Sequence, residues 1–287
     1  MTIDPSTHRA ETSNVPTWCP GCGNFALWSA LNHVLAVTNI APHQAAVVFD
    51  IGCSGNGANW VKAYCFHGLH GRAVPLATGI ALANHRLKTI VISGDGAAYG
   101  EGLGHFLHAI RSNPDLTYIV ENNQLYALTK GQASPTSAEG FKTVSTPTGV
   151  TDEPLNPIAL AISADCSYVA RGFAGDLPHL EGLIQGALAH RGFAFIDVFQ
   201  PCVTFNRLNT FAWFYERIRK LDELGHDPSD RPSAWQRAVS ANDDLPIGLF
   251  YRAERPTLQD RLPVLRPGPL VDQPLTVDLS RLYEGLS

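Results

Sequence analysis

Residues 89–132 constrain the fold of this chain more than any other stretch. They begin with an apolar, β-branched run over residues 89–93, which predicts a buried strand that ends at a Gly-Asp-Gly turn. Apolar residues at helical spacing predict a helix over residues 99–111, which stops at Asn113, and a second strand follows over residues 116–120. A strand, a helix and a strand of these lengths form one right-handed parallel unit, so the stretch predicts an α/β sheet.

Polar residues follow both strands of this unit. Asp95 lies in the first turn and Asn123 in the second, 28 residues further on (123 − 95 = 28). We expect the two side chains to lie side by side at the carboxyl ends of the strands, where open α/β sheets bind their ligands. A carboxylate, an amide carbonyl and a main-chain carbonyl suit Mg²⁺ or Ca²⁺ that also binds phosphate. The glycines around Asp95 let the backbone approach a diphosphate, and the next helix offers it N–H groups.

Composition and charge argue against several classes of protein. The chain of 287 residues is 45% hydrophobic, which is ample for a core in one large domain or two small ones. A net charge of −5 without a basic cluster argues against a nucleic acid partner. The most apolar segment, residues 25–37, is too short to span a membrane. Because the N-terminus has no secretory signal pattern, we expect a cytoplasmic protein.

Predicted strands and helices alternate along most of the chain. Helices are expected over residues 24–37, 74–84, 157–164 and 177–190, and strands over residues 45–50, 167–172 and 193–198. This alternation predicts a doubly wound, mostly parallel sheet. Residues 133–154 are rich in Ser, Thr and Pro, and we expect them to form an ordered loop over the site.

The two ends of the chain differ from this pattern. Residues 1–17 are polar and should be flexible, ahead of a site-bearing domain over residues 18–205. In the remaining segment, residues 206–287, we expect a helix over residues 211–224 and an edge strand over residues 247–251. The end of the chain is rich in Pro and Leu without clear periodicity. This composition indicates an irregular arm that packs on the domain or on a partner.

Four of the six cysteines lie in turns that contain Gly or Pro. Without a secretory signal, cysteines indicate thiols or metal ligands rather than disulfides. Cys19 and Cys22 form a close pair that can be a redox dithiol, half of a zinc site or half of an iron–sulfur site. No strand precedes the pair, as one would in a thioredoxin, and no second close pair completes a zinc site. Cys53 and Cys202 each follow a predicted strand, so four thiolates would suit a [4Fe–4S] cluster; the alternative is that these two are small buried hydrophobic residues.

The other cysteines and two histidines have more ordinary interpretations. Cys65 and Cys166 lie within apolar segments, and we expect both in the core. His70 lies in a loop with glycines and suits a contact with a diphosphate, whereas we expect a structural role for His67.

Six segments of this chain, taken in order, resemble one protein family. They are WCPGCGNF, DIGCSGNG, HGLHGRA, ISGDG, ENNQLYALTKGQASPTS and QPC. Together they are similar to the β subunit of a 2-oxoacid:ferredoxin oxidoreductase, a protein with the thiamine diphosphate-binding fold. The likeness runs from Trp18 to about Phe205, so residues 18–205 would bind the cofactors and residues 206–287 would pack on this domain or on a partner.

The resemblance implies a set of cofactor ligands. Asp95, Asn123 and the carbonyl of Leu125 would bind Mg²⁺. The [4Fe–4S] cluster would be held by Cys19, Cys22, Cys53 and Cys202. Thiamine diphosphate would be lined by Ile51, Gly52, Cys53, Ser54, His70, Gly96, Ala97, Ala127 and Leu128.

The activity implied by the resemblance is the coenzyme A-dependent oxidative decarboxylation of a 2-oxoacid, or the reverse reductive carboxylation, with ferredoxin as electron carrier. The segment Thr129-Lys130-Gly131-Gln132 is similar to members that take 2-oxoglutarate, and Lys130 and Asn56 are the candidate substrate contacts. Pyruvate or another 2-oxoacid is the alternative. Many relatives have Asp at the position of Ala97 and Arg or Lys at the position of Asn56.

No catalytic residue is predicted in this chain. Thiamine chemistry needs a carboxylate on the aminopyrimidine ring, but Glu101 and Glu121 are better explained as solvated or structural groups. As in the family, an α subunit in an αβ or α2β2 assembly is expected to supply that Glu. Two alternatives remain: a non-redox thiamine decarboxylase or carboligase whose cysteines only pack, and a zinc-stabilised scaffold without catalysis.

Overall fold

The structure, a computed structural model, describes residues 12–240, 243–274, 276 and 279–284. Its strands are β1 (Ala45–Phe49), β2 (Tyr64–His67), β3 (Lys88–Gly94), β4 (Leu116–Asn122), β5 (Leu125–Tyr126), β6 (Gln132–Ala133), β7 (Tyr168–Phe173), β8 (Phe193–Phe199), β9 (Ile218–Lys220) and β10 (Leu245–Arg252). Its α-helices are α1 (Asn24–Val37), α2 (Ala73–Ala83), α3 (Leu103–Ser112), α4 (Pro157–Ser163), α5 (Leu177–Ala189), α6 (Phe211–Arg217), α7 (Arg231–Ala238), α8 (Leu258–Arg261) and α9 (Ser280–Glu284).

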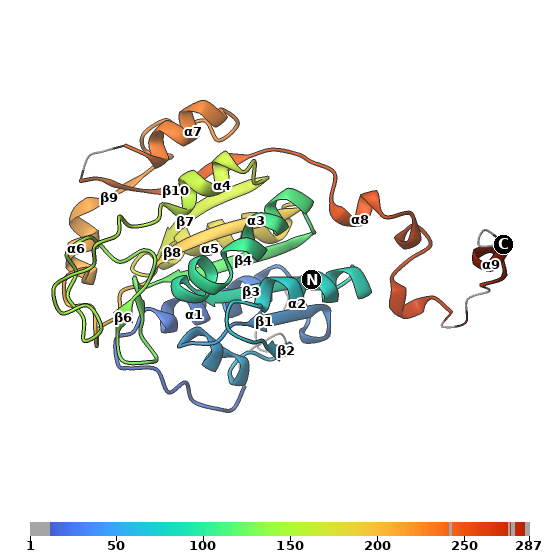
Figure 1. Ribbon diagram of the computed structural model, residues 1–287, viewed down its shortest axis with the longest axis horizontal. Coiled ribbons are helices and arrows are strands. Elements are labelled where there is room, and N and C mark those ends of the chain that lie inside the picture. The colour runs from blue at the N-terminus through green and yellow to red at the C-terminus, as the bar shows by residue number, and fades with distance from the viewer. Residues whose placement is uncertain (1–11, 241–242, 275, 277–278, 285–287) are drawn as a thin grey trace.

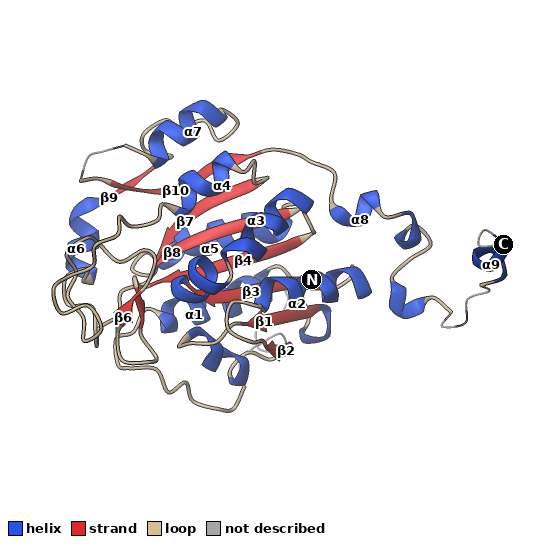
Figure 2. Ribbon diagram, in the orientation of Figure 1, coloured by secondary structure: helices blue, strands red, loops and turns tan. Residues whose placement is uncertain are grey.

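One eight-stranded sheet organises the fold, in the order β2-β1-β3-β4-β8-β7-β10-β9. The first six strands in this order are parallel, and β10 is antiparallel to β7. Helices α2, α3 and α4 pack on one face and α1 and α5 on the other (Figure 1), so the red strands in Figure 2 lie between blue helices. The predicted doubly wound, mostly parallel sheet is confirmed.

Alternate side chains of the central strands supply the two apolar layers. On β8, Phe193 and Phe195 face the layer with α2, α3 and α4, whereas Ala194 and Ile196 face α1 and α5. Both β4 and β8 are buried at every residue. Since helices cover both faces of a parallel sheet, its central strands are nearly continuously apolar, which is the pattern that marked them in the sequence.

Several element boundaries differ from the prediction. The first residues of the helix predicted over residues 99–111 belong instead to a π-helical turn, Ala97–Glu101, and α3 begins at Leu103. The prediction of a helix over residues 211–224 is wrong for the second half of that range. Ile218 becomes extended there and pairs with Leu245 of β10. That pairing also makes β9 the outer strand, so β10 is not at the edge as predicted. Local periodicity cannot reveal such long-range pairing.

Strand β2, at the opposite edge of the sheet, was not predicted. Its residue Cys65 is only half-buried, so the prediction of a core position is wrong for this cysteine. An edge strand has a neighbour on one side only, which leaves its side chains less covered. Cys166 is fully buried, as predicted. Helix α7 and the short β5–β6 hairpin were also missed.

Asn113 connects the end of α3 to the C-terminal arm. It adopts a left-handed conformation with φ of 55° and ends the helix at the predicted place. Its buried amide donates to the carbonyls of Arg255 and Pro256, and its backbone carbonyl accepts from the N–H of Leu258. The arm then runs away from the body (Figure 1), with an ion pair between Arg86 and Asp272.

Residues 1–11 of the predicted flexible N-terminal segment lie outside the described residues. The first described residue of that segment is Thr12, whose hydroxyl donates a hydrogen bond to the carbonyl of Asn59. None of the helices in the described part of the chain is long and apolar enough to cross a membrane.

A buried ion pair lies inside the sheet. Arg171 on β7 donates to Asp197 on β8 at 3.1 Å, and the side chains are 8% and 0% exposed. Asp197 also accepts hydrogen bonds from the hydroxyl of Tyr99, at 2.7 Å, and from the amide of Asn122, at 3.0 Å. The guanidinium of Arg171 stacks on Phe199, 4.7 Å from the ring centroid. The carboxylate is therefore fully engaged where no water can replace a lost partner.

Replacing Asp197 with Ala should lower the free energy of unfolding by about 3–5 kcal/mol, because it leaves Arg171 charged and unpaired in the core. Denaturant titration of the two proteins measures the difference. The matched control is Asp272→Ala, which breaks an ion pair whose side chains are 59% and 51% exposed. That change should cost less than about 1 kcal/mol. Equal losses from the two substitutions would contradict this account of the buried pair.

Candidate active site

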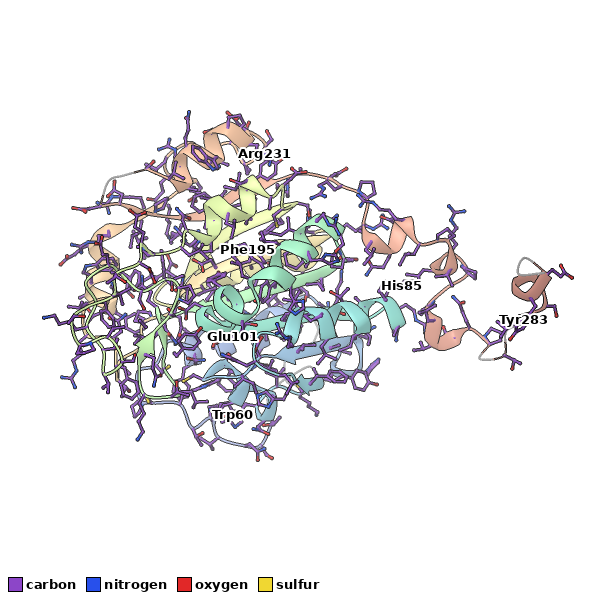
Figure 3. All side chains as sticks on the ribbon, viewed as in Figure 1. Trp60, His85, Glu101, Phe195, Arg231 and Tyr283 are labelled. Atoms are coloured by element: carbon purple, nitrogen blue, oxygen red, sulfur yellow. The ribbon has the colours of Figure 1, made fainter. Side chains whose placement is uncertain are left out.

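The polar turns that follow β1, β3, β4 and β8 gather at one rim of the sheet. Gly94 of β3 pairs with Glu121 of β4, so Asp95 lies level with Asn122, and Asn123 follows immediately beyond. This rim is the carboxyl end of the parallel strands, as the sequence predicted. In Figure 3, Glu101 and His85 mark opposite ends of the sheet, since Glu101 follows β3 and His85 precedes it.

Asp95 is buried with one carboxylate oxygen free. Its Oδ2 accepts hydrogen bonds from the hydroxyls of Ser134, at 2.5 Å, and Thr136, at 2.7 Å. Its Oδ1 is buried without a hydrogen-bond partner. Burial raises the pKa of Asp95 to about 6, against the opposing effect of the two hydroxyls. A buried, partnerless carboxylate oxygen fits a cation, which would hold the group ionised.

The two asparagines at the end of β4 have different surroundings. The amide of Asn122 is already used, because its nitrogen donates to Asp197 and its oxygen lies 2.9 Å from the hydroxyl of Thr136. Asn123 accepts a hydrogen bond from the N–H of Leu125, at 3.0 Å, and borders the cavity described below. Asn123 and Leu125 therefore belong to one turn, and the amide oxygen of Asn123, unlike that of Asn122, contacts this turn and not the core.

Asp50 joins two of the predicted diphosphate loops. Its fully buried carboxylate accepts from the N–H groups of Ile51 and Gly71, both at 2.8 Å, and from the hydroxyl of Ser93. It thereby holds the turn of residues 51–54 against the loop that carries His70. No role was predicted for Asp50, although an acidic residue directly after an apolar strand could have indicated one.

His70 and Gly96 lie near each other on this rim. The ring of His70 is 5.9 Å from the ring of Tyr126, and its Nε2 is 3.2 Å from Glu101. The hydroxyl of Tyr126 reaches the carbonyl of Gly96 at 3.3 Å, and a Cβ at Gly96 would overlap the Tyr126 ring. Only glycine fits at this approach. The side chain of Glu101 is 45% exposed to solvent.

Cys19, Cys22, Cys53 and Cys202 line a single cavity of about 190 Å³. Asn56, Asn123, Ala127 and Leu128 border the same cavity. Candidate residues for the cluster, the metal and the cofactor thus share one space, although they come from turns far apart in the chain. The indole of Trp18 donates to the carbonyl of Cys53 at 2.8 Å and ties the first turn to the second.

The cavity keeps two of its thiols, Cys22 and Cys53, protonated. Burial, with smaller contributions from nearby Glu121 and the other thiols, raises the pKa of Cys22 and of Cys53 to about 12. Such thiols ionise only beside positive charge, which iron would supply. Within the described ranges, no three His, Cys, Asp or Glu side chains are grouped closely enough to hold one metal ion. In a cubane each cysteine binds a different iron, so its ligands stand farther apart than those of a zinc ion.

Glu121 is structural rather than solvated. It is 4% exposed and accepts a hydrogen bond of 2.6 Å from the amide of Asn24. Burial raises its pKa to about 8. Lys130, in contrast, is exposed, in a left-handed conformation with φ of 81°, and the adjacent Gly131 lies against Phe205 at the cavity.

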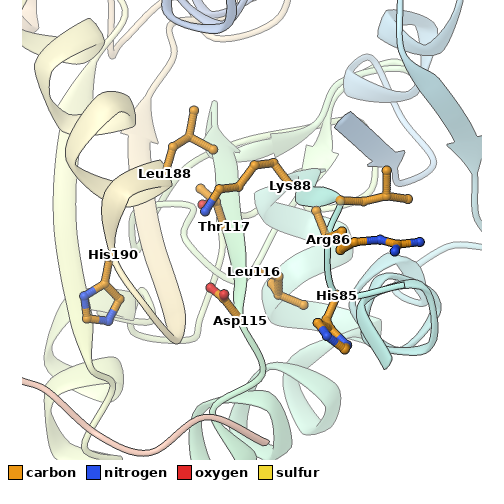
Figure 4. Close-up of a pocket in the computed structure, with 10 residues that line it drawn as sticks. His85, Arg86, Lys88, Asp115, Leu116, Thr117, Leu188 and His190 are labelled. Atoms are coloured by element: carbon orange, nitrogen blue, oxygen red, sulfur yellow. The ribbon is translucent and has the colours of Figure 1, made fainter. Parts of the chain in front are cut away.

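A smaller hollow lies at the opposite end of the sheet (Figure 4). His85, Lys88, Asp115 and His190 are among the residues that line it. Its volume of about 40 Å³ has room for only a few water molecules. Of the two hollows, only the cysteine-lined cavity adjoins the polar rim.

Comparison with known proteins agrees with this geometry. Residues 50–198 match the family model described as thiamine pyrophosphate enzyme, C-terminal TPP binding domain. Residues 202–267 match the family model for the C-terminal part of the pyruvate ferredoxin oxidoreductase beta chain. A solved structure, 2-oxoglutarate:ferredoxin oxidoreductase from Magnetococcus marinus with 2-oxoglutarate, coenzyme A and succinyl-CoA bound, superimposes with a TM-score of 0.91. Its sequence is 33% identical to this chain, and the match covers 100% of this chain and 97% of the chain in the solved structure.

Two curated relatives show the same similarity. The 2-oxoacid:ferredoxin oxidoreductase subunit beta of Saccharolobus solfataricus is 42% identical over 283 residues, which cover 93% of this chain and 92% of the relative. The 2-oxoglutarate synthase subunit KorB of Archaeoglobus fulgidus is 38% identical over 221 residues, which cover 76% of this chain and 82% of the relative. The chain therefore has the thiamine diphosphate-binding fold and belongs to the β subunits of the 2-oxoacid:ferredoxin oxidoreductases.

Proposed function

We propose that this β subunit binds Mg²⁺–thiamine diphosphate and one [4Fe–4S] cluster side by side, and that with an α subunit it oxidises 2-oxoglutarate. The observation that carries the proposal is the shared cavity, which four cysteines line together with Asn123, Ala127 and Leu128. A cofactor held by the last three residues would be adjacent to a cluster held by the cysteines. Short separation is what single-electron transfer between the two requires.

The chain's own residues would bind and orient the cofactors. Asp95 would bind Mg²⁺ through its free Oδ1, while Ser134 and Thr136 hold the other oxygen in place. The amide oxygen of Asn123 and the carbonyl of Leu125 would complete the protein ligands. The turn of residues 51–54, His70, Gly96 and Ala97 would line the diphosphate end, with backbone N–H groups as donors.

The bound groups would supply the redox chemistry: thiamine diphosphate is the electron sink for loss of CO₂ from a 2-oxoacid, and a cubane accepts electrons singly. Part of the cavity wall is formed by the buried residues Cys202 and Ala127, which would keep water from that side of the space between the two groups. The raised pKa of Cys22 and of Cys53 means that cluster binding must release the protons of these two thiols.

An α subunit would complete the site. The two glutamates near the predicted turns do not suit the aminopyrimidine ring, because Glu121 is buried against Asn24 and Glu101 contacts His70 at the diphosphate rim. The activating Glu would therefore come from the partner. Ferredoxin would receive the electrons and coenzyme A the acyl group. The Magnetococcus marinus relative was solved with 2-oxoglutarate and coenzyme A, which favours these substrates here.

A non-redox thiamine decarboxylase is the second candidate, in which the four cysteines would only pack. Packing does not need four thiols around a cavity, so the redox assignment is preferred. A zinc scaffold would need ligands around one ion, and the described residues contain no such group.

Mg²⁺ affinity should rise with pH below about 6 and level off above it. The metal binds the ionised carboxylate, and the raised pKa of Asp95 means that a proton competes up to about pH 6. Each pH unit below that value should weaken binding about tenfold. Mg²⁺-dependent binding of thiamine diphosphate to the reconstituted complex, titrated between pH 5 and 8, measures this. Affinity that is flat across this range would argue against Asp95 as the ligand.

Serine at any one of Cys19, Cys22, Cys53 or Cys202 should reduce cluster content strongly, because each thiolate holds a different iron. Iron and sulfide analysis and the visible absorbance of anaerobically purified complexes measure the loss. Cys65→Ser is the matched control, since this half-buried thiol lies on β2 and does not line the cavity. A full cluster in all four variants would remove the assignment, and zinc in its place would favour the scaffold.

The function itself is tested by assaying a panel of 2-oxoacids with coenzyme A and ferredoxin. The complex should turn over 2-oxoglutarate best, and this chain without its α subunit should show no turnover. Lys130→Met should raise KM about tenfold for 2-oxoglutarate and much less for pyruvate. A tenfold change is the effect of losing a contact of about 1.4 kcal/mol between Lys130 and the second carboxylate of 2-oxoglutarate. Lys88→Met, at the other end of the sheet, should change neither value. Equal effects of Lys130→Met on both substrates would remove Lys130 from the site.

A further inference from the structure

Gln200 lies directly after β8, two residues before Cys202, and its side chain is fully buried. Its amide nitrogen donates to the sulfur of Cys22 at 3.3 Å and to Oδ1 of Asn24 at 2.6 Å. The first contact spans 178 residues of sequence. Neither the sequence motifs nor the proposed ligand set gives this side chain a role.

The orientation of the Gln200 amide is fixed by its neighbours. The reverse orientation would place its oxygen 2.6 Å from Oδ1 of Asn24, and two amide oxygens repel at that distance. Asn24 is itself held, because its own amide nitrogen donates to Glu121 at 2.6 Å. The nitrogen of Gln200 therefore faces Cys22, and its Oε1 stays buried without a partner.

Packing also leaves the Gln200 side chain little freedom. Its backbone N–H donates to the carbonyl of Asn122 at 3.0 Å, which anchors the residue to β4. The side chain lies across Gly23, where an added Cβ would be 2.7 Å from Cγ of Gln200 and 3.2 Å from Ala174. The glycine after Cys22 thus leaves the space that this amide occupies.

Ionisation of Cys22 would make the Gln200 contact more important. The Cys22 thiol donates to Oδ1 of Asn24 at 3.0 Å. A thiolate bound to iron has no hydrogen to donate, so that contact is lost. The amide of Gln200 then remains as a donor to the sulfur, and hydrogen bonds to a ligating sulfur stabilise the added negative charge of a reduced cluster.

We propose that Gln200 is a positioning residue of the iron–sulfur site, which donates a hydrogen bond to the Cys22 ligand and raises the reduction potential of the cluster. The inference rests on the proposed function, since it requires a cluster on the cysteines. It assigns to Gln200 an effect on how readily the cluster accepts electrons, distinct from the binding of iron.

Two variants of the reconstituted complex test this role. Gln200→Met keeps the length of the side chain but removes the donor, and Gln200→Glu keeps its shape but places a carboxylate against the sulfur. Redox titration followed by electron paramagnetic resonance gives the midpoint potential of the cluster. We expect it to be more negative in both variants, and most negative in Gln200→Glu. Gln236→Leu, on the exposed surface of α7, should leave the potential unchanged.

Iron and sulfide content separates this inference from the proposed function. A wild-type complex without iron and sulfide overturns the function and the inference with it. The inference alone is overturned by a different result. In that case the wild-type complex has a full cluster, but the midpoint potential is unchanged or less negative in whichever variant retains its cluster. Loss of the cluster from both variants would also overturn it, because Gln200 would then be needed to hold iron rather than to tune it.

Discussion

A continuous set of hydrogen bonds from the core to the rim is the constraint on which the site depends. Arg171 pairs with Asp197, which accepts from Asn122; the hydroxyl of Thr136 lies 2.9 Å from the amide oxygen of Asn122 and donates its single hydrogen to Asp95. Each member is buried, so none can exchange a lost partner for water. The orientation of the Asp95 carboxylate is therefore set by an ion pair deep within the sheet, and its free Oδ1 is a consequence of the fold.

The same topology gives the cysteine cavity its chemical character. Turns after β1 and β8 and the turn before α1 converge on one rim, although they are far apart in the sequence. Convergence partly buries Cys22 and Cys53, and burial raises the pKa of both thiols to about 12. Gln200, Asn24 and Glu121 form the polar support of the cavity.

Much of the site could be predicted because its signals are local. The Gly-Asp-Gly turn, the Asn pair and the Cys-Pro-Gly-Cys turn are short motifs at the ends of periodic segments, and the strand periodicity indicated which sheet edge they share. The pairing of Ile218 with Leu245 could not be predicted, since the helical pattern of residues 211–224 carries no record of a distant strand. The roles of Asp50 and Asp197 were missed for the same reason, because their partners are set by loop packing and strand register.

The alternation of strands and helices, the family resemblance and the residue types at the rim can all be read from the order of the amino acids. Folding is needed to show which oxygen of Asp95 stays free, that Asn122 is hydrogen-bonded in the core while Asn123 borders the cavity, and that Gln200 reaches Cys22. The physical reason is that composition and periodicity act over a few residues. Hydrogen-bond partners and burial depend instead on register and packing between segments that the chain brings together only on folding.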